Sequence, residues 1–488
     1  MADPSTLDAR SSLVTPGGPR GAEVLALMIA WAPSEPERTG EVALFEPDAG
    51  ARILGRGEPG SGSGGERVVF HRQRPGRLDR TPPLSSPGIS REQLRIRLEQ
   101  GQLRVQRIGR CPMELWGEAL ESCMLKPGDT LLLRGQLLLL CTQRPWQMPP
   151  LRSASLASAP PFGAPDSHGI VGESPAAWHL RDRIAWTASA DEHTLLLGGS
   201  GSGKELCARA IHALSSRATG PFVARNAATI PSSLIDAELF GNVKGYPNPG
   251  MPERPGLVGA AHKGTLFLDE IGELPQELQA NLLRVLDEGG EYHALGASSA
   301  KRSNLRLIGA TNRDPSVLKH DLAARLVVRL DVPGLDERRD DIPLLARHLL
   351  ARASEKSPEA MRRFLPSAGP RLEASLVEHL LSHRFVTHIR ELNALLWRAM
   401  STSTGDAIAW NDASPSREPP PSSSDGASEP SAAASPPEAP EPSAEEVRAS
   451  LEQHQGNVTR AAQALGLSSR YVLYRLMKRY GIGSAEGA

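Results

Sequence analysis

The chain has 488 residues, a formal net charge of −1 and 39% hydrophobic residues. At roughly 100–200 residues per domain, this length predicts about three folding units, and the near-neutral charge argues against a chain that binds polyanions along its whole length. The 4 cysteines form no C-x-x-C pair and no apolar stretch approaches about 18 residues, so we expect a cytoplasmic protein without a zinc module, disulfide framework, export signal or membrane span.

Residues 22–143 alternate short apolar runs with turns. In the runs LRIRLE (94–99) and LRVQRI (103–108), apolar and polar residues alternate with a period of two. This alternation is typical of antiparallel strands that are buried on one face. The segment is therefore predicted to form a small β-sandwich.

Two segments of low complexity interrupt the chain. Residues 144–166 and 411–442 are rich in Pro, Ser and Ala, and the second also contains many Glu residues. Segments of such composition bury too little apolar surface to offset the entropy lost on ordering. We predict a linker at each, the second an extended and disordered tether.

A phosphate-binding loop is predicted in residues 167–410, where strand-like runs alternate with helical patterns as in a parallel α/β sheet. Gly198, four further residues, Gly203 and Lys204 lie between a strand and a helix. Glycines let backbone N–H groups surround an anion at a helix N-terminus, and the lysine reaches the β- and γ-phosphates. The alternative is a glycine-rich turn without a ligand. The predicted nucleotide contacts are Gly198, Gly199, Ser200, Gly201, Ser202, Gly203, Lys204 and Glu205.

Two adjacent carboxylates, Asp269 and Glu270, end the next apolar strand. Ligands of open α/β sheets bind at the carboxyl ends of the strands. Glu205 stands where a Ser or Thr normally contacts Mg²⁺, so Asp269 is predicted to hold the Mg²⁺ of an ATP complex and Glu270 to polarise the attacking water. The alternative is a solvated strand end.

Residues 167–410 resemble the AAA+ domain of the sigma-54-dependent activators, the bacterial enhancer-binding proteins, whose phosphate loop reads G-E-S-G-T-G-K-E. The matching segments are Pro221–Asn226, Glu238–Gly241, Gly264–Gly272, Leu282–Leu286, Gly309–Asp314 and Arg390–Asn393. This resemblance implies an α/β P-loop domain with a small helical lid. It also implies that Asn226 switches the catalytic glutamate, that Asn312 is the first sensor near the γ-phosphate, and that Arg390 is the second.

The resemblance further implies a ring, by analogy a hexamer, that acts on RNA polymerase containing sigma-54. Family members contact sigma-54 through a G-A-F-T-G-A loop, where this chain has Gly245-Tyr-Pro-Asn-Pro-Gly250. Two prolines remove backbone donors and restrict φ, so we expect a stiffer loop with doubtful sigma-54 contact. Tyr246 is an alternative source of the missing aromatic side chain.

The arginines that act on a neighbour's nucleotide are incomplete. The family pattern F-R-x-D-L-x-x-R-L corresponds to Leu318–Leu326, in which Lys319 replaces the first arginine and Arg325 retains the second. A lysine lacks the planar fork of arginine. We expect Lys319 and Arg325 to occupy the catalytic positions, with ATP binding retained and hydrolysis slow.

Residues 443–488 show helix-turn-helix spacing and resemble the Fis-type DNA-binding domain that ends these activators. One predicted helix carries Ala461, Ala462 and Leu465, Gly466 makes the turn and a basic second helix follows. The alternative is a solvated basic helix. The predicted DNA contacts are Arg470, Tyr471, Arg475, Lys478 and Arg479.

Residues 22–143 resemble a forkhead-associated (FHA) domain, a β-sandwich that binds phosphothreonine peptides. The resemblance rests on Gly55-Arg56, Ser90-Arg91 and the run Leu125–Leu133, and it implies that Arg56, Ser90 and Arg91 bind the phosphate. Gln93 replaces the family's histidine, and a clear Asn-Gly is absent near Leu115–Gly117.

The sequence thus predicts an oligomeric, ATP-dependent transcription regulator with FHA input and DNA-binding output. Two alternatives remain open. One is a DNA-bound scaffold that uses ATP structurally and needs no sigma-54. The other is an ATPase that remodels a different protein.

Overall fold

The computed structural model describes residues 22–47, 50–58, 65–156, 159–231, 233–287, 289–365, 369–411 and 444–453, together with Leu465 and Tyr480. It divides into one unit that ends at Ala413 and a second unit that begins at Ser414. In the second unit, α11 spans Ala444–Gln453. The predicted DNA contacts Arg470, Tyr471, Arg475, Lys478 and Arg479, and nearly all of the tether 411–442, lie outside the described residues.

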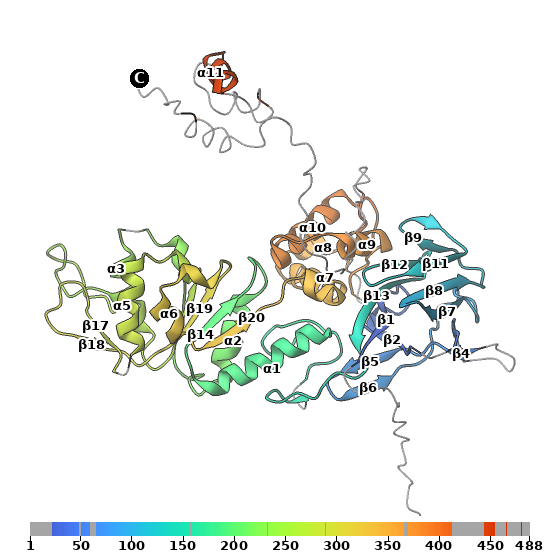
Figure 1. Ribbon diagram of the computed structural model, residues 1–488, viewed down its shortest axis with the longest axis horizontal. Coiled ribbons are helices and arrows are strands. Elements are labelled where there is room, and N and C mark those ends of the chain that lie inside the picture. Colours follow the sequence, from blue (N-terminus) through green and yellow to red (C-terminus); the bar gives the residue numbers. More distant parts are fainter. Residues whose placement is uncertain are drawn as a thin grey trace, which may run out of the picture. The chain divides into compact units, whose positions relative to one another are not determined.

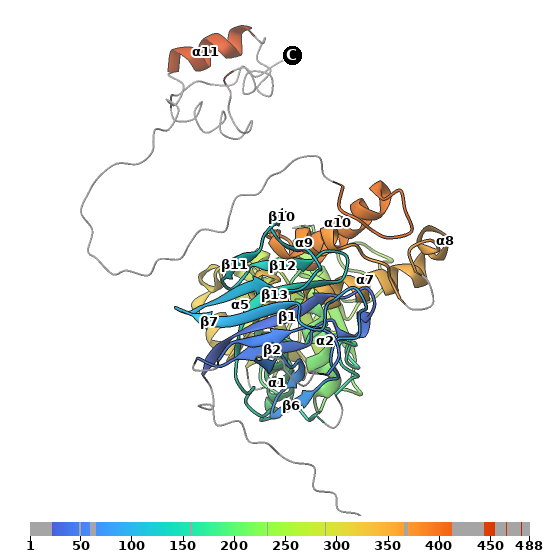
Figure 2. The same cartoon turned by 90° about the vertical axis from the view of Figure 1, so that its right-hand side faces the viewer.

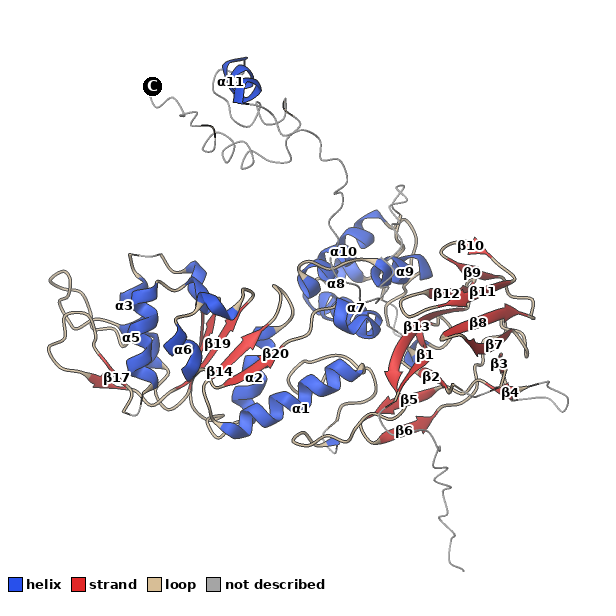
Figure 3. Ribbon diagram, in the orientation of Figure 1, coloured by secondary structure: helices blue, strands red, loops and turns tan. Residues whose placement is uncertain are grey.

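Two facing β-sheets form the N-terminal part of the first unit, as the period-two pattern predicted (Figures 1 and 3). One sheet has the strand order β10-β9-β12-β13-β1-β2-β5-β6 and the other β11-β8-β7-β3-β4. Leu27, Ile29, Leu94, Ile96 and Leu103 are completely buried between them. The strands are β1 (Glu23–Trp31), β2 (Val42–Phe45), β3 (Arg52–Leu54), β4 (Glu66–Arg67), β5 (His71–Arg74), β6 (Arg77–Arg80), β7 (Leu94–Glu99), β8 (Gln102–Arg107), β9 (Met113–Leu115), β10 (Glu118–Ala119), β11 (Ser122–Leu125), β12 (Thr130–Leu133) and β13 (Leu137–Pro145).

A parallel sheet flanked by helices follows, in the order β15-β16-β19-β14-β20. Its central strands read as apolar runs because helices cover both faces. Ser174 caps the first helix, since its Oγ accepts the N–H of Ala177 at 3.1 Å. The strands are β14 (Thr194–Leu197), β15 (Phe222–Asn226), β16 (Thr265–Asp269), β19 (Arg306–Thr311) and β20 (Val328–Asp331), with a hairpin of β17 (Glu291–Tyr292) and β18 (Lys301–Arg302). The helices are α1 (Pro175–Ala190), α2 (Lys204–Leu214), α3 (Ile235–Phe240), α4 (Gly256–Ala260), α5 (Gln276–Leu286) and α6 (His320–Arg325).

The helical lid contains α7 (Ile342–Lys356), α8 (Pro358–Met361), α9 (Ala374–Ser382) and α10 (His388–Thr402). A 3₁₀ segment, η6 (Asp336–Asp341), joins it to β20. On α10, Leu392, Leu396 and Met400 are buried at helical spacing and point into the lid core. In Figure 1 the lid, in orange, lies beside β12 and β13, and the turned view in Figure 2 shows β13, β1 and β2 side by side.

Parts of the segment 144–166, predicted to be a linker, pack against other parts of the chain where the structure describes them. Strand β13 continues to Pro145, and Arg144 and Met148 are only 1% and 2% exposed. The ring of Phe162 lies 5.1 Å and 5.5 Å from the guanidinium carbons of Arg72 and Arg74. The prediction considered only the apolar surface that the segment itself provides. In the structure, large side chains of the segment pack against residues from other parts of the chain.

Candidate nucleotide site

The predicted phosphate-binding loop connects β14 to α2. Gly198, Gly201 and Gly203 have backbone φ values of 156°, 78° and 107°, which residues other than glycine rarely adopt. A Cβ on Gly201 would lie 2.3 Å from the carbonyl oxygen of Thr387. Glycine is therefore required here both for the backbone turn and for the close approach of the lid.

Lys204 begins α2 and is 6% exposed. Its Nζ donates hydrogen bonds to the carbonyl oxygens of Gly198 at 2.9 Å and Gly199 at 3.1 Å. Burial lowers the pKa of this amine, and the carboxylates of Asp269 and Glu270 oppose that effect. The amine is thus a buried cation held at the loop that would receive the phosphates.

Ser202 provides a direct test of whether the loop fits a nucleotide. Its Oγ is buried and has no hydrogen-bond partner among the described residues. A buried hydroxyl without a partner is costly, and a phosphate oxygen or a metal-bound water at the loop would satisfy it. The residues present therefore fit a triphosphate with its magnesium.

Asp269 and Glu270 lie at the carboxyl end of β16, next to the end of β15. Asn226 pairs with Asp269 across these strands, and its Nδ2 donates to Asp269 Oδ2 at 3.4 Å. Asn226, which the resemblance implies switches the catalytic glutamate, thus contacts Asp269, the residue predicted to hold Mg²⁺. Glu270 has a φ of 51°, and its Oε2 accepts the backbone N–H of Asn312 at 3.4 Å.

The lid contributes Arg390 to the site. Its Nη1 donates to Ser200 Oγ at 2.9 Å. The backbone N–H of the preceding residue, Ile389, donates to the carbonyl oxygen of Gly201 at 3.2 Å. Residues nearly two hundred positions apart are thus brought together at the loop. The predicted second sensor therefore contacts the phosphate-binding loop directly.

His388 is a residue that the sequence analysis missed. Its ring lies against the phosphate-binding loop, because a Cβ on Gly199 would be 2.5 Å from His388 Nε2. The other nitrogen, Nδ1, accepts the backbone N–H of Leu335 at 3.3 Å. The residue has a φ of 42°. Its place two residues before Arg390 is the signal that could have suggested it.

Glu205 and the two cations expected to act on a neighbour form their ion pairs and hydrogen bond with residues outside the phosphate-binding loop. Glu205 forms an exposed ion pair with Arg209 at 2.8 Å. Arg325 forms an ion pair with Asp287 at 2.6 Å. The backbone N–H of Lys319 donates to Gln279 Oε1 at 2.8 Å. Within the described ranges no group of three or more His, Cys, Asp or Glu side chains could hold a metal ion.

The loop that replaces G-A-F-T-G-A is held at its base by Asn242, which is 3% exposed. Asn242 Nδ2 donates to the carbonyl oxygens of Val243, Tyr246 and Pro252 at 3.0, 3.2 and 3.0 Å. The Tyr246 ring packs on Gly296, where an added Cβ would lie 2.6 Å from Tyr246 Cγ. Asn242 thus holds the two ends of this loop together, and the Tyr246 ring packs the loop on the neighbouring hairpin.

The residues predicted to bind phosphothreonine lie together at one end of the sandwich. The backbone N–H of Arg56 donates to Ser90 O at 3.1 Å, and Arg67 donates to the carbonyl oxygens of Arg91, Arg56 and Gly57. Gln93, which replaces the histidine, is completely buried. In the described part of the chain no hydrogen bond occupies the exposed Arg56 and Arg91 guanidinium groups.

Residues 170–335 match the sigma-54 interaction domain family, and residues 336–429 match an AAA+ ATPase lid domain. The transcriptional regulatory protein ZraR of Escherichia coli (strain K12) is 36% identical over 333 residues, which cover 66% of this chain and 72% of ZraR. The chain belongs to the sigma-54-dependent transcriptional regulators. This agrees with the resemblance drawn from the motifs, and the boundary at 335/336 coincides with the start of η6.

Other regulators of this family are similar over shorter spans. The Nif-specific regulatory protein of Bradyrhizobium diazoefficiens is 40% identical over 253 residues, and the chain spans 42% of that relative's length. A crystal structure of NtrX from Brucella abortus in complex with ATP has 30% identity and a TM-score of 0.44, covering 64% of this chain and 69% of that one. Among the described helices, none combines the length and the apolar character needed to span a bilayer.

Proposed function

We propose that this sigma-54-family regulator is a cytoplasmic protein that binds ATP with Mg²⁺ between the phosphate-binding loop and the Asp269–Glu270 edge, and that nucleotide controls its assembly on DNA. The observation that carries the proposal is the buried Lys204 amine beside the unpartnered Ser202 hydroxyl, with Asp269 and Glu270 close enough to act on the lysine. No other arrangement in the described residues gathers these groups around a glycine loop.

Each residue has a separate task in this proposal. Lys204 would leave the Gly198 and Gly199 carbonyls and neutralise the β- and γ-phosphates. Mg²⁺ would supply charge neutralisation between those phosphates, with Asp269 as its protein ligand. Glu270 would orient the attacking water, while Asn226 restrains Asp269 and the Asn312 backbone restrains Glu270.

Binding and hydrolysis by the full chain test this proposal. We expect wild-type protein to bind Mg-ATP, Lys204→Ala to lose binding, and Glu270→Gln to bind without turnover. Lys356→Ala is the matched control, because Lys356 is exposed at the end of α7. Equal ATP affinity for Lys204→Ala and wild type would contradict the proposal.

The output proposed is regulation of transcription by an oligomer, by resemblance a hexamer, whose residues 443–488 bind DNA. The alternative favoured by a specific observation is an ATP-dependent regulator that does not act through sigma-54, because Asn242 and the Tyr246–Gly296 contact hold the loop in place. Open-complex formation with sigma-54 RNA polymerase separates the two. A nucleotide-dependent open complex supports the activator, and its absence at saturating ATP supports the alternative.

The input proposed is a phosphothreonine peptide bound by Arg56, Ser90 and Arg91. The adjacent Arg56 and Ser90 backbones and the exposed guanidinium groups support it. A labelled peptide is expected to bind only when phosphorylated, and Arg56→Ala is expected to weaken it. Arg95→Ala, an exposed arginine on β7, is the control. Equal binding of both peptide forms would contradict this input.

A further inference from the structure

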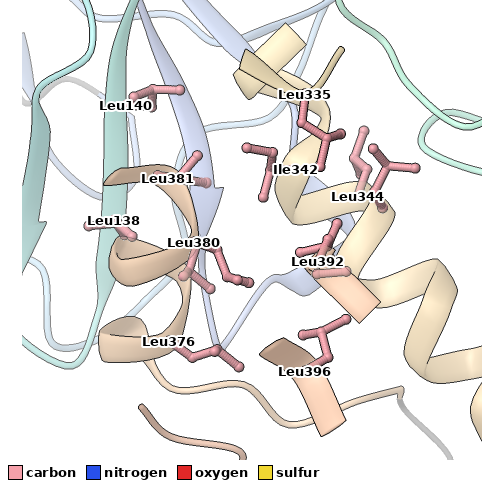
Figure 4. Close-up of a cluster of buried hydrophobic side chains, with 14 of the residues drawn as sticks. Leu138, Leu140, Leu335, Ile342, Leu344, Leu376, Leu380, Leu381, Leu392 and Leu396 are labelled. Atoms are coloured by element: carbon pink, nitrogen blue, oxygen red, sulfur yellow. The ribbon is translucent and has the colours of Figure 1, made fainter. Parts of the chain in front are cut away.

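The outer face of the sandwich's larger sheet is buried against the lid. Met28, Val42 and Leu138 from the sandwich belong to one hydrophobic cluster with Leu376 and Leu380 from α9, and each is at most 1% exposed. Figure 4 shows Leu138 and Leu140 on the strand facing Leu380 and Leu381 on the helix. Antiparallel sheets commonly leave one face in water, whereas this sheet is covered on both faces.

Polar contacts cross the same boundary. Trp31 Nε1 donates to the carbonyl oxygen of Leu372 at 2.6 Å, and Thr142 Oγ1 donates to Asp340 Oδ1 at 3.0 Å. Hydrogen bonds fix the orientation that apolar packing alone leaves free. The sandwich and the lid are therefore joined by apolar packing and by hydrogen bonds.

Arg144 lies where the sandwich and the lid meet the nucleotide-binding core. It is 1% exposed, and its Nε donates to Asp340 Oδ2 at 2.9 Å. Its Nη1 contacts Gln73 Oε1 at 3.3 Å and the backbone oxygen of Glu173 at 3.4 Å. One guanidinium group thus contacts three parts of the chain: the sandwich, the segment that precedes α1, and η6. The 3₁₀ segment η6 connects β20 to the lid and is called the hinge below.

The hinge also contacts the phosphate-binding loop, through Arg338, which lies two residues before Asp340. Asp341, next to Asp340, accepts the backbone N–H groups of Glu173 and Ser174 at 2.8 and 2.9 Å. Arg338 is 4% exposed, and its Nη2 donates to the backbone oxygen of Ser202 at 3.3 Å. Asp340 is therefore connected to the loop that holds Ser202 through η6, in which Arg338, Asp340 and Asp341 are buried.

We propose that Arg144, a residue of the β-sandwich, is a positioning residue for the nucleotide site, and that it acts through Asp340 and η6 on the phosphate-binding loop. The proposal rests on the proposed ATP site. Through this route the sandwich influences ATP affinity, because η6 contacts both Arg144 and the phosphate-binding loop and also connects to the lid. A ligand that shifts the sandwich then shifts nucleotide affinity.

Calorimetric titration of the full-length chain with Mg-ATP tests the route. Arg144→Met is expected to weaken ATP binding by about threefold to tenfold. Thr142→Val removes only one hydrogen bond to Asp340 and is expected to weaken binding in the same direction by about twofold. Arg97→Met, an exposed arginine on β7, is the matched control and is expected to bind like wild type.

A double variant, Arg144→Met with Asp340→Leu, separates positioning from stability. Replacing a buried ion pair by apolar side chains generally recovers stability, so this variant is expected to melt near wild type while its ATP affinity stays reduced. If affinity recovers together with stability, the role of Arg144 is only structural and the inference is overturned. If Arg144→Met does not fold, unchanged affinity in Thr142→Val overturns it.

The two proposals fail differently. Wild-type protein without ATP binding would overturn the proposed function and, with it, this inference. Wild-type binding with unchanged affinity in the folded variants would overturn the inference alone.

Discussion

Arg390 on α10 donates a hydrogen bond to Ser200 Oγ in the phosphate-binding loop, with 2.9 Å between the two atoms. The adjoining Ile389 N–H donates to Gly201, so two contacts attach the start of α10 to the loop. The lid therefore contacts the loop through one side-chain hydrogen bond and one backbone hydrogen bond. ATP phosphates would compete with Ser200 for the same guanidinium group.

The Arg390 contact makes the first prediction. Arg390→Ala is expected to weaken ATP binding by about tenfold to a hundredfold, because a hydrogen bond from a charged donor contributes about 1.5–3 kcal/mol. Fluorescence titration with an ATP analogue measures it. Arg384→Ala, a nearby exposed arginine, is expected to bind normally. Equal affinities of the two variants would remove Arg390 from the site.

Arg325 should separate ATP binding from hydrolysis. In the single chain it pairs with Asp287, and both side chains are about half exposed, at 54% and 47%. Such a pair contributes about 0–1 kcal/mol to stability. Arg325→Ala is thus expected to leave melting and ATP binding unchanged while oligomer turnover falls by about 10³ or more.

The measurement for Arg325 is phosphate release at a protein concentration that supports assembly. Arg329→Ala is the control, since its side chain is exposed on β20. Normal turnover in Arg325→Ala would show that this arginine does not act on a neighbour's nucleotide.

The sheet–lid packing predicts a large stability effect at Leu380. This residue is 1% exposed, and Leu→Ala at such positions costs about 2–5 kcal/mol. Leu380→Ala is expected to lower the melting temperature of the first unit clearly. Leu214→Ala, at a leucine that is 49% exposed, is expected to change it little. Similar melting of both variants would show that the lid does not depend on the sandwich.

His193 predicts how stability depends on pH. Burial lowers its pKa below the ordinary 6.5, and its Nδ1 accepts the Leu307 N–H at 3.0 Å, so the folded state holds the ring neutral. Between the folded pKa and 6.5 the unfolded chain binds more protons. Its contribution is therefore present above pH 6.5 and is lost as the pH falls through that window.

Urea unfolding at several pH values between about 5 and 8 measures this slope. His193→Asn is expected to flatten it, because the titrating ring is removed while an oxygen can still accept the Leu307 N–H. His320→Asn is the control, because that side chain is 98% exposed. An unchanged slope in His193→Asn would assign the pH dependence to other groups.

Much of the nucleotide site could be predicted from the sequence because its parts are local. Gly198 to Lys204 form one strand–loop–helix segment, and Asp269 and Glu270 end an apolar run. Backbone geometry and parallel strand alignment then place these residues at one edge of the sheet. The same reasoning could not predict that Asn226 contacts Asp269, because that choice depends on side-chain distance across β15 and β16.

By itself, therefore, the sequence determined the phosphate-binding loop, the parallel sheet, the sandwich strands and the family, because short-range patterns and motifs carry them. Only the tertiary structure decided that residues 144–166 pack, that β1 is covered on both faces and that Arg144 lies between Asp340 and Glu173. The physical reason is that burial and charge pairing depend on partners that are distant along the chain, such as Asp340, 196 positions from Arg144, and no local pattern specifies them.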